Sequence, residues 1–159
     1  MAEILVPIVL GSKADLEHAG AIGKVLEELG VAYEIRIASA HKATHYLLDM
    51  LARYEDSGKA LVYITVAGRS NALSGVVDAN VTAPVIACPP YSDRFGGMDI
   101  LSSLRMPSGL GAVVVLEPEG AALAAAKMLA LVEPGLGEKV RRYQEKNRGR
   151  IEEDDRGLR

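Results

Sequence analysis

EILVPIVLGSKAD, residues 3–15, joins a nearly unbroken apolar run to a short turn that contains a glycine. Residues 3–10 have the length and composition of a strand that is buried on both faces of a sheet. Beyond the turn, apolar residues recur at helical spacing between residues 15 and 29, at Ala19, Ile22, Val25, Leu26 and Leu29. Gly30 is a natural helix stop. The segment therefore predicts a buried strand followed directly by an amphipathic helix.

The same strand and helix pattern repeats along the chain. Residues 31–37 alternate like a strand, and a helix over 44–58 follows, its apolar face formed by Tyr46, Leu47, Met50, Leu51 and Tyr54. Further strands are predicted over 60–66, 84–88 and 112–116, and an alanine-rich helix over 119–131. Five strands separated by helices predict an α/β fold with a parallel sheet and helices on both of its faces.

The length and the charged C-terminus set the domain organisation. A chain of 159 residues with 49% hydrophobic residues has the size of one ordinary domain, so we expect a single domain over residues 1–159. From residue 141 onward the sequence is mostly charged, and we expect a last helix or tail that projects from the core and frays or lies on a neighbouring subunit. The nearly uncharged helix over 121–131 has an apolar face that we expect a partner to cover.

Charge and cysteine content exclude several classes of function. The net charge is −3 with both signs interspersed, so a small molecule is expected as partner rather than nucleic acid or a membrane. The first apolar run is too short to span a bilayer and lacks the pattern of a signal peptide, which favours the cytoplasm. Cys88 is the single cysteine, and no Cys or His cluster has metal-ligand spacing, so neither a disulfide nor a structural zinc is expected.

Ligands of open α/β sheets gather outside the carboxyl ends of the strands, so the loops there are candidate site segments. GSKAD, residues 11–15, follows the first strand. Gly11 lets the backbone approach a ligand, Ser12 offers a hydroxyl and an N–H group, and the next helix presents its positive end to an anion. The loop therefore fits a phosphate group. The structural alternative is that Gly11 makes a tight turn and that Ser12 or Asp15 caps the helix.

SAHK, residues 39–42, follows the second strand at the same edge of the sheet. Ser39 can donate a hydrogen bond, Lys42 can pair with a phosphate, and histidine is the side-chain type whose ordinary pKa suits proton transfer near neutral pH. The alternative is that His41 merely caps or packs. His45 and His18 lie within predicted helices, so position favours His41 as the functional histidine.

The later loops are also rich in small residues. They are AGRSNALSG (67–75), CPPYSDRFGGMD (88–99), SSLRMPSGLG (102–111) and EPEG (117–120). Prolines stiffen such loops and glycines let them fold tightly, which suits a rigid site. Taken singly, each could be an ordinary turn, with Arg69 and Arg105 as solvated charges. Their number at one sheet edge favours a binding site.

In this order and spacing, the segments resemble the PurE family, the phosphoribosylaminoimidazole carboxylases of purine biosynthesis, over residues 4–131. One departure is Ala14, where family members often carry Ser or Thr. The resemblance implies a flavodoxin-like, three-layer α/β/α sandwich. It also implies a homo-oligomer, usually an octamer and otherwise a tetramer, with sites between subunits.

The resemblance also implies roles for the motif residues. Ser12 and Asp15 would hold the phosphate and ribose of the substrate, and Ser39 and Lys42 would help to bind the phosphate. His41 would carry the proton that leaves the carboxylated carbon, a task that suits a general base. No metal, biotin or ATP is needed for this chemistry.

Further substrate contacts are implied for Gly11 and for the AGRSN loop. Gly68, Ser70 and Asn71 would bring backbone N–H groups near the carboxylate and act as an oxyanion-type clamp. These assignments complete the expected site.

The family has two branches with different loops. The common bacterial branch carries SAHR and a longer AGAGGAAH loop, and it rearranges N5-carboxyaminoimidazole ribonucleotide. The animal-like branch carries SAHK, AGRSN and CPP and joins carbon dioxide directly to aminoimidazole ribonucleotide. This sequence resembles the second branch, and the mutase reaction is the alternative.

Two other protein classes share the α/β pattern. A receiver-like signalling module would need an acidic cluster after the first strand and an aspartate at the end of the third, but VLGSK and VAGRS supply neither. A non-catalytic flavin- or nucleotide-binding module is disfavoured by the aromatic content of 4% and the absence of Trp. Neither class explains SAHK.

Overall fold

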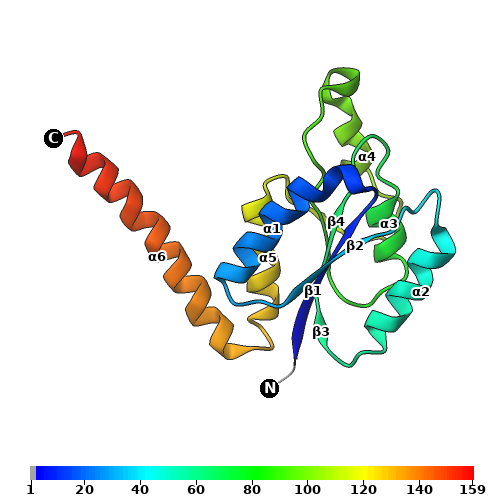
Figure 1. Cartoon of the computed structure of the whole chain (residues 1–159), viewed down its shortest axis with the longest axis horizontal. Helices are drawn as coiled ribbons and strands as arrows, with labels where there is room; N and C mark the ends of the chain where they lie inside the picture. The colour runs from blue at the N-terminus through cyan, green and yellow to red at the C-terminus, as the bar shows by residue number, and fades with distance from the viewer. Residues whose placement is uncertain (1–2) are drawn as a thin grey trace.

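A parallel sheet with helices on both faces forms the body of the protein (Figure 1). The computed structural model describes residues 3–159. The strand order is β2–β1–β4–β5–β6 with β3 beside β1, and every pairing is parallel. Counting β3 and β4 as the one predicted strand, this is the 2-1-3-4-5 order of flavodoxin-like folds. The strands are β1 (Ile4–Leu10), β2 (Tyr33–Ile37), β3 (Ala60–Leu61), β4 (Tyr63–Val66), β5 (Val85–Ala87) and β6 (Val113–Val114).

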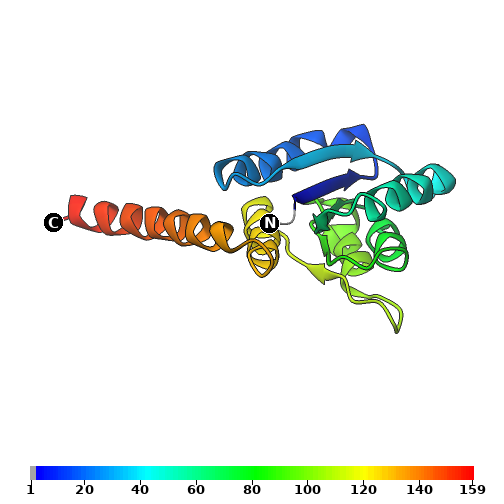
Figure 2. The ribbon, with the colours of Figure 1, turned by 90° about the horizontal axis from the view of Figure 1, so that it is seen from below.

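The two faces of the sheet are covered by different helices, which confirms the predicted three-layer fold (Figures 1 and 2). Val6, Ile8 and Leu10 of β1 lie in the core beneath α1 (Leu16–Glu28) and α5 (Pro118–Leu129). Leu5 and Val9 point to the opposite core, beneath α2 (Thr44–Glu55) and α3 (Leu73–Asp78). Successive side chains of a strand point to opposite faces, so a strand covered on both sides must be apolar at nearly every position.

The apolar faces predicted for the first two helices are largely confirmed. Ala19, Ile22 and Leu26 of α1 are buried, and Gly30 ends that unit with a φ of +65°. In α2 the prediction is wrong for Tyr46, which is 48% exposed. The tyrosine lies at the margin of the buried face of the helix, which explains its exposure. Its hydroxyl accepts a hydrogen bond from Nη2 of Arg36 at 3.3 Å.

The predicted strand 60–66 is divided at Val62, and Pro7 supplies the physical reason. The N–H of Val6 donates to Ala32 on the β2 side, so the backbone nitrogen of residue 7 faces β3 and β4. Proline has no N–H to donate there. The ladder to β1 is therefore interrupted between Leu61 and Ile64.

Three short helical segments lie where the sequence pattern indicated loops. They are α3, η2 (Arg94–Ile100) and α4 (Leu101–Leu104). Phe95, Gly96 and Gly97 have left-handed φ values inside η2, so the chain turns there and no long apolar repeat develops. A further single turn, η1 (Lys13–Asp15), leads into α1.

The alanine face of the helix predicted over 121–131 does not need a partner to cover it. Ala121, Ala122, Ala125, Ala126 and Leu129 of α5 are all buried within the chain itself, in the core that also contains residues of α1 and α6. Exposed apolar side chains gather instead on η2 and α4, at Phe95, Met98, Leu101 and Leu104.

The C-terminal helix α6 (Pro134–Gly157) projects from the body, as predicted, although it begins before residue 141 (Figures 1 and 2). Leu136, Val140 and Tyr143 anchor its first half in the core, and the Tyr143 hydroxyl donates to Glu119 at 2.6 Å. Residues 151–159, at and beyond its distal end, are exposed. Within residues 3–159, no helix has both the length and the apolar character needed to cross a membrane.

Two glycines of α1 provide a test of this packing. A Cβ on Gly20 would meet no atom within 4 Å, so Gly20→Ala should raise the free energy of unfolding by about 0.5–1 kcal/mol through helix propensity. A Cβ on Gly23 would lie 2.6 Å from Cε2 of Tyr33. Because overpacking typically costs about 1–3 kcal/mol, Gly23→Ala should destabilise the protein. Urea unfolding of both variants measures the difference, and equal stabilisation by both would contradict the packing of Tyr33 on α1.

Candidate active site

A cavity of about 550 Å³ opens where the carboxyl ends of β1, β2, β4 and β5 meet, and we call it the strand-end cavity. Parallel pairing brings these ends to one edge, as expected for a ligand site in an open α/β sheet. The lining comes from four loops: Gly11, Ser12, Ala14, Asp15, Ser39, Ala40, His41, Lys42, Ala67, Gly68, Arg69, Ser70, Leu73, Pro90, Tyr91, Ser92, Arg94 and Asp99. All the predicted site residues except Asn71 therefore lie around one space.

The loop after β1 is not built around a helix cap. The Oγ atom of Ser12 donates to Oδ2 of Asp15 at 3.3 Å, and neither side chain accepts a hydrogen bond from the helix backbone. The capping alternative for Ser12 and Asp15 is therefore wrong. Gly11 does not have a positive φ, and a Cβ there would make only an ordinary 3.5 Å contact with Ala67. The backbone turn therefore does not require a glycine at this position.

The SAHK turn is held by its own backbone and hydroxyl groups. The N–H of Lys42 donates to Oγ of Ser39 at 3.2 Å, and the N–H of Ala43 donates to the Ser39 carbonyl at 2.9 Å. Thr44 Oγ1 donates to the Ala40 carbonyl at 2.7 Å. The side chains of His41 and Lys42 are exposed at the cavity. The turn thus fixes the backbone while leaving both functional side chains available.

Of the three histidines in the chain, His41 alone lines the cavity. His45 is exposed on α2 outside the cavity lining. His18 is partly buried on α1, with Nε2 3.3 Å from Sγ of Cys88, and burial lowers the pKa of His18. Burial raises the pKa of the Cys88 thiol to about 12, so Cys88 is a buried thiol rather than a nucleophile.

The loop after β4 is pinned to the segment 99–103. Arg69 has a φ of +60°, a left-handed conformation that is uncommon for arginine. Its N–H donates to Oδ2 of Asp99 at 3.1 Å, and the N–H of Asn71 donates to Oγ of Ser102 at 2.9 Å. The Asn71 side chain is buried, donating to Ser103 and accepting from the N–H of Ser74. Asn71 therefore anchors the loop and does not line the cavity.

The loop after β5 adds site residues that no local sequence pattern indicates. Tyr91, Arg94 and Asp99 line the strand-end cavity, and the Tyr91 hydroxyl donates to Glu117 after β6. A smaller cavity of about 250 Å³ adjoins the first and is lined by Gly68, Pro89, Pro90, Tyr91, Ser92, Gly97, Asp99, Ile100, Ser103 and Leu116. The glycine pair 96–97 indicates only a tight turn, and its left-handed conformation returns Asp99 to the site.

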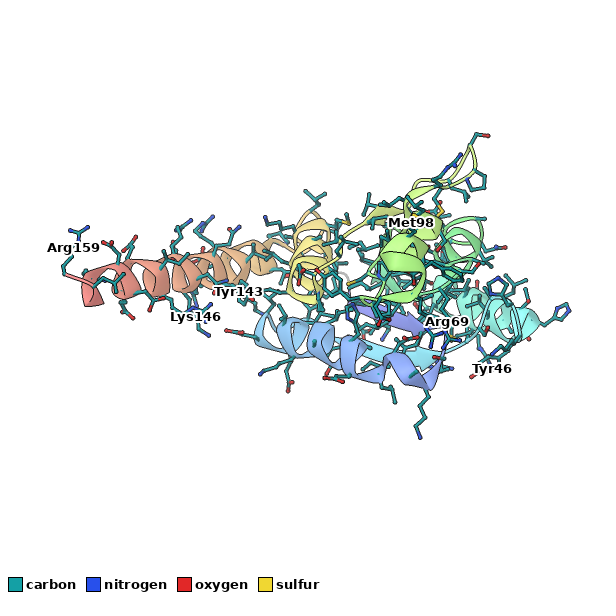
Figure 3. All side chains as sticks on the ribbon, turned by 90° about the horizontal axis from the view of Figure 1, so that it is seen from above. Tyr46, Arg69, Met98, Tyr143, Lys146 and Arg159 are labelled. Carbon is teal, nitrogen blue, oxygen red and sulfur yellow. The ribbon has the colours of Figure 1, made fainter. Side chains whose placement is uncertain are left out.

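Two expected parts of the sheet edge contribute less than predicted. The stretch 106–111 lines neither of these cavities and extends away from the sheet as the yellow-green loop in Figure 2. Arg105 is exposed and also lies outside both linings. Arg69, in contrast, lines the cavity, and Figure 3 places it at the opposite end of the molecule from Arg159 of α6.

The charged groups of the strand-end cavity favour an anionic ligand. Lys42, Arg69 and Arg94 supply three cations, whereas Asp15 and Asp99 supply two carboxylates. The Asp15 carboxylate accepts a hydrogen bond from Ser12, and the Asp99 carboxylate accepts one from the Arg69 amide. The cationic side chains therefore remain the groups most available to a phosphate or carboxylate.

Comparison with known proteins places this site in a family. The family model described as AIR carboxylase matches residues 5–150. Phosphoribosylaminoimidazole carboxylase of Archaeoglobus fulgidus is 52% identical over 152 residues, covering 96% of this chain and 83% of that protein. The human bifunctional phosphoribosylaminoimidazole carboxylase/phosphoribosylaminoimidazole succinocarboxamide synthetase is 44% identical over 126 residues, 79% of this chain and 30% of that protein.

A solved structure agrees with the sequence comparisons over the whole fold. The crystal structure of Treponema denticola PurE superimposes with a TM-score of 0.95 at 49% identity, covering 98% of this chain and 99% of that chain. The match includes the loops that line the strand-end cavity as well as the sheet. The chain belongs to the AIR carboxylase (PurE) family of purine-biosynthesis enzymes.

Proposed function

We propose that this protein carboxylates 5-aminoimidazole ribonucleotide (AIR) at C4 with carbon dioxide, giving 4-carboxy-5-aminoimidazole ribonucleotide (CAIR). The observation that carries the proposal is His41 beside Lys42 at a cavity that also exposes the 11–15 and 67–70 loops. The names of the relatives from Archaeoglobus fulgidus and Treponema denticola support it. The chain would act as one catalytic domain in the cytoplasm.

The reaction divides into two bond changes. The aminoimidazole ring is an electron-rich enamine, so C4 attacks the carbon of carbon dioxide and a C–C bond forms. C4 then carries both its hydrogen and the new carboxylate. Removal of that hydrogen as a proton returns the electron pair to the ring and restores aromaticity. His41 takes the proton, a step for which a positioned base typically contributes about 10²–10⁴-fold in rate.

The ribonucleotide phosphate binds between the first two loops in this proposal. Lys42 pairs with the phosphate, Ser39 lies beside it, and Ser12 and Asp15 hold the phosphate and ribose. Gly11 lets the substrate approach the backbone closely, since no side chain stands there. The excess of cations around the cavity supports a ligand that carries several negative charges.

The loop sequences favour carboxylation over rearrangement of N5-carboxyaminoimidazole ribonucleotide. A mutase must accept a bulky carbamate and keep the released carbon dioxide captive, whereas a carboxylase admits free carbon dioxide to a preformed pocket. The 67–75 loop is short and contains no histidine, and Lys42 offers a point charge in place of an arginine fork. The mutase reaction is the second candidate.

A homo-oligomer, most often an octamer and otherwise a tetramer, is part of the proposal. Met98, Leu101 and Leu104 recur at helical spacing on η2 and α4 and are 63%, 49% and 55% exposed, while Phe95 beside them is 81% exposed. Exposed apolar surface of this kind usually marks an interaction site. Because the same segment reaches the cavity through Asp99, a second copy bound there would lie close to the site.

His41→Asn should keep the fold and lower turnover of AIR by at least about 10²-fold, because asparagine cannot carry the proton. Steady-state rates with AIR and bicarbonate measure the loss. His45→Asn is the matched control, since His45 is exposed in the same region without lining the cavity. Near-normal turnover by His41→Asn would assign the proton transfer to another group.

The carboxylase and mutase reactions can be separated with two substrates. We expect CAIR formation from AIR to saturate with added bicarbonate in the presence of carbonic anhydrase and without ATP. N5-carboxyaminoimidazole ribonucleotide should be a poor substrate under the same conditions. Faster turnover of the N5-carboxylated compound than of AIR at saturating carbon dioxide would make this protein a mutase.

Light scattering at micromolar concentration should show a stable oligomer. Leu101→Glu should weaken assembly, because a charge would be buried in the proposed contact. Ala52→Glu on the exposed side of α2 is the control and should leave assembly unchanged. A monomeric wild-type protein would contradict the oligomer, and an unaffected Leu101→Glu variant would move the contact to another surface.

A further inference from the structure

Of the four successive backbone N–H groups from Gly68 to Asn71, every second one donates a hydrogen bond within the protein. The amides of Arg69 and Asn71 donate to Asp99 and Ser102 at 3.1 and 2.9 Å. Within residues 3–159, neither the Gly68 nor the Ser70 amide donates a hydrogen bond. Gly68, Arg69 and Ser70 line the strand-end cavity, whereas Asn71 does not. Segment 99–102 thus binds every second amide and leaves the intervening ones for a ligand.

The Arg69 conformation depends on this arrangement. Arginine has a Cβ, which makes a φ of +60° unfavourable unless the surroundings impose it. The contact made by its amide is the carboxylate of Asp99, a charged acceptor. Ser102 adds a second tether two residues later, and its own hydroxyl donates to the Asp99 carbonyl at 2.7 Å. The loop is therefore held from one short segment at two points.

We propose that Asp99 is a positioning residue, which with Ser102 holds Arg69 in the left-handed conformation and so aims the Gly68 and Ser70 amides at the new carboxylate. The inference rests on the proposed function, because it identifies the group that these amides bind. AIR lacks that carboxylate and CAIR carries it. Asp99 therefore acts on the carboxylated state and leaves AIR binding almost unchanged.

The first test measures kcat and KM after the carboxylate of Asp99 is removed. Asp99→Ala should lower kcat by about 10²-fold, the loss typical for a disturbed oxyanion donor, while KM for AIR stays within about threefold. Asp99→Asn should keep most of the activity, because its amide oxygen still accepts from the Arg69 N–H. In the His41→Asn background, which slows turnover, Asp99→Ala should weaken CAIR binding and spare AIR binding.

Two substitutions of Arg69 test whether Asp99 acts by positioning the Arg69 backbone or by contacting the substrate directly. Glycine adopts a φ of +60° without strain, whereas alanine keeps the Cβ, and both remove the guanidinium group. Asp99→Ala should therefore cost about 10²-fold in kcat when combined with Arg69→Ala, and less than about fivefold when combined with Arg69→Gly. An equal loss in both backgrounds would overturn the inference, because Asp99 would then act on the substrate or on the fold.

Binding of AIR and CAIR to the wild-type protein tests the proposed function separately from the role of Asp99. If neither AIR nor CAIR binds the wild-type protein, the proposed function fails. If both bind and Asp99→Ala behaves like the wild type, the positioning role alone fails. Ser102→Ala serves as a second variant should Asp99→Ala fold poorly, and it should show the same split between kcat and KM with a smaller loss. An unchanged kcat in Ser102→Ala would also count against the inference.

Discussion

Burial of β1 on both faces, with parallel ladders on both edges, is the constraint that the rest of this structure depends on. Leu10 pairs in register with Ile37 of β2 and with Val66 of β4. The next residues along each strand therefore leave the sheet at the same level, which places three loops around one space. A shift of register by one residue would turn every β1 side chain to the wrong face. The hydrophobic core thus holds the site in place.

Within that frame, each loop divides its polar groups between holding itself and facing the cavity. The Oγ atom of Ser39 accepts the Lys42 N–H within its own turn, and the Asn71 side chain binds Ser74 of its own turn and Ser103 of α4. His41 and Lys42, by contrast, expose their side chains at the cavity. Unpaired polar groups add nothing to the stability of the free protein, but they need no rearrangement before they bind a ligand. The site is prearranged because hydrogen bonds of neighbouring residues fix the loop backbones.

The sequence predicts the layers and the first loops well because those depend on local signals. Apolar periodicity defines β1 and α1, and the loops GSKAD and SAHK follow strands whose parallel direction can be inferred. What covers the apolar face of α5 cannot be predicted from local sequence. The same apolar pattern is expected whether α1 and α6 of the chain or a partner protein packs on that face. The role of Asp99 cannot be predicted from local sequence, because it depends on a hydrogen bond with Arg69, 30 residues away in sequence.

Arg69 shows how stability and function conflict at one position. Glycine would adopt its left-handed backbone without strain, and AGRSN already has a glycine at the preceding residue. An arginine at a position where the backbone suits glycine indicates that its side chain has a function. Its guanidinium group is one of three cations at the cavity, where two carboxylates are also present. Without Arg69 the cations and carboxylates would be equal in number, and the attraction of the site for an anionic ribonucleotide would be weaker.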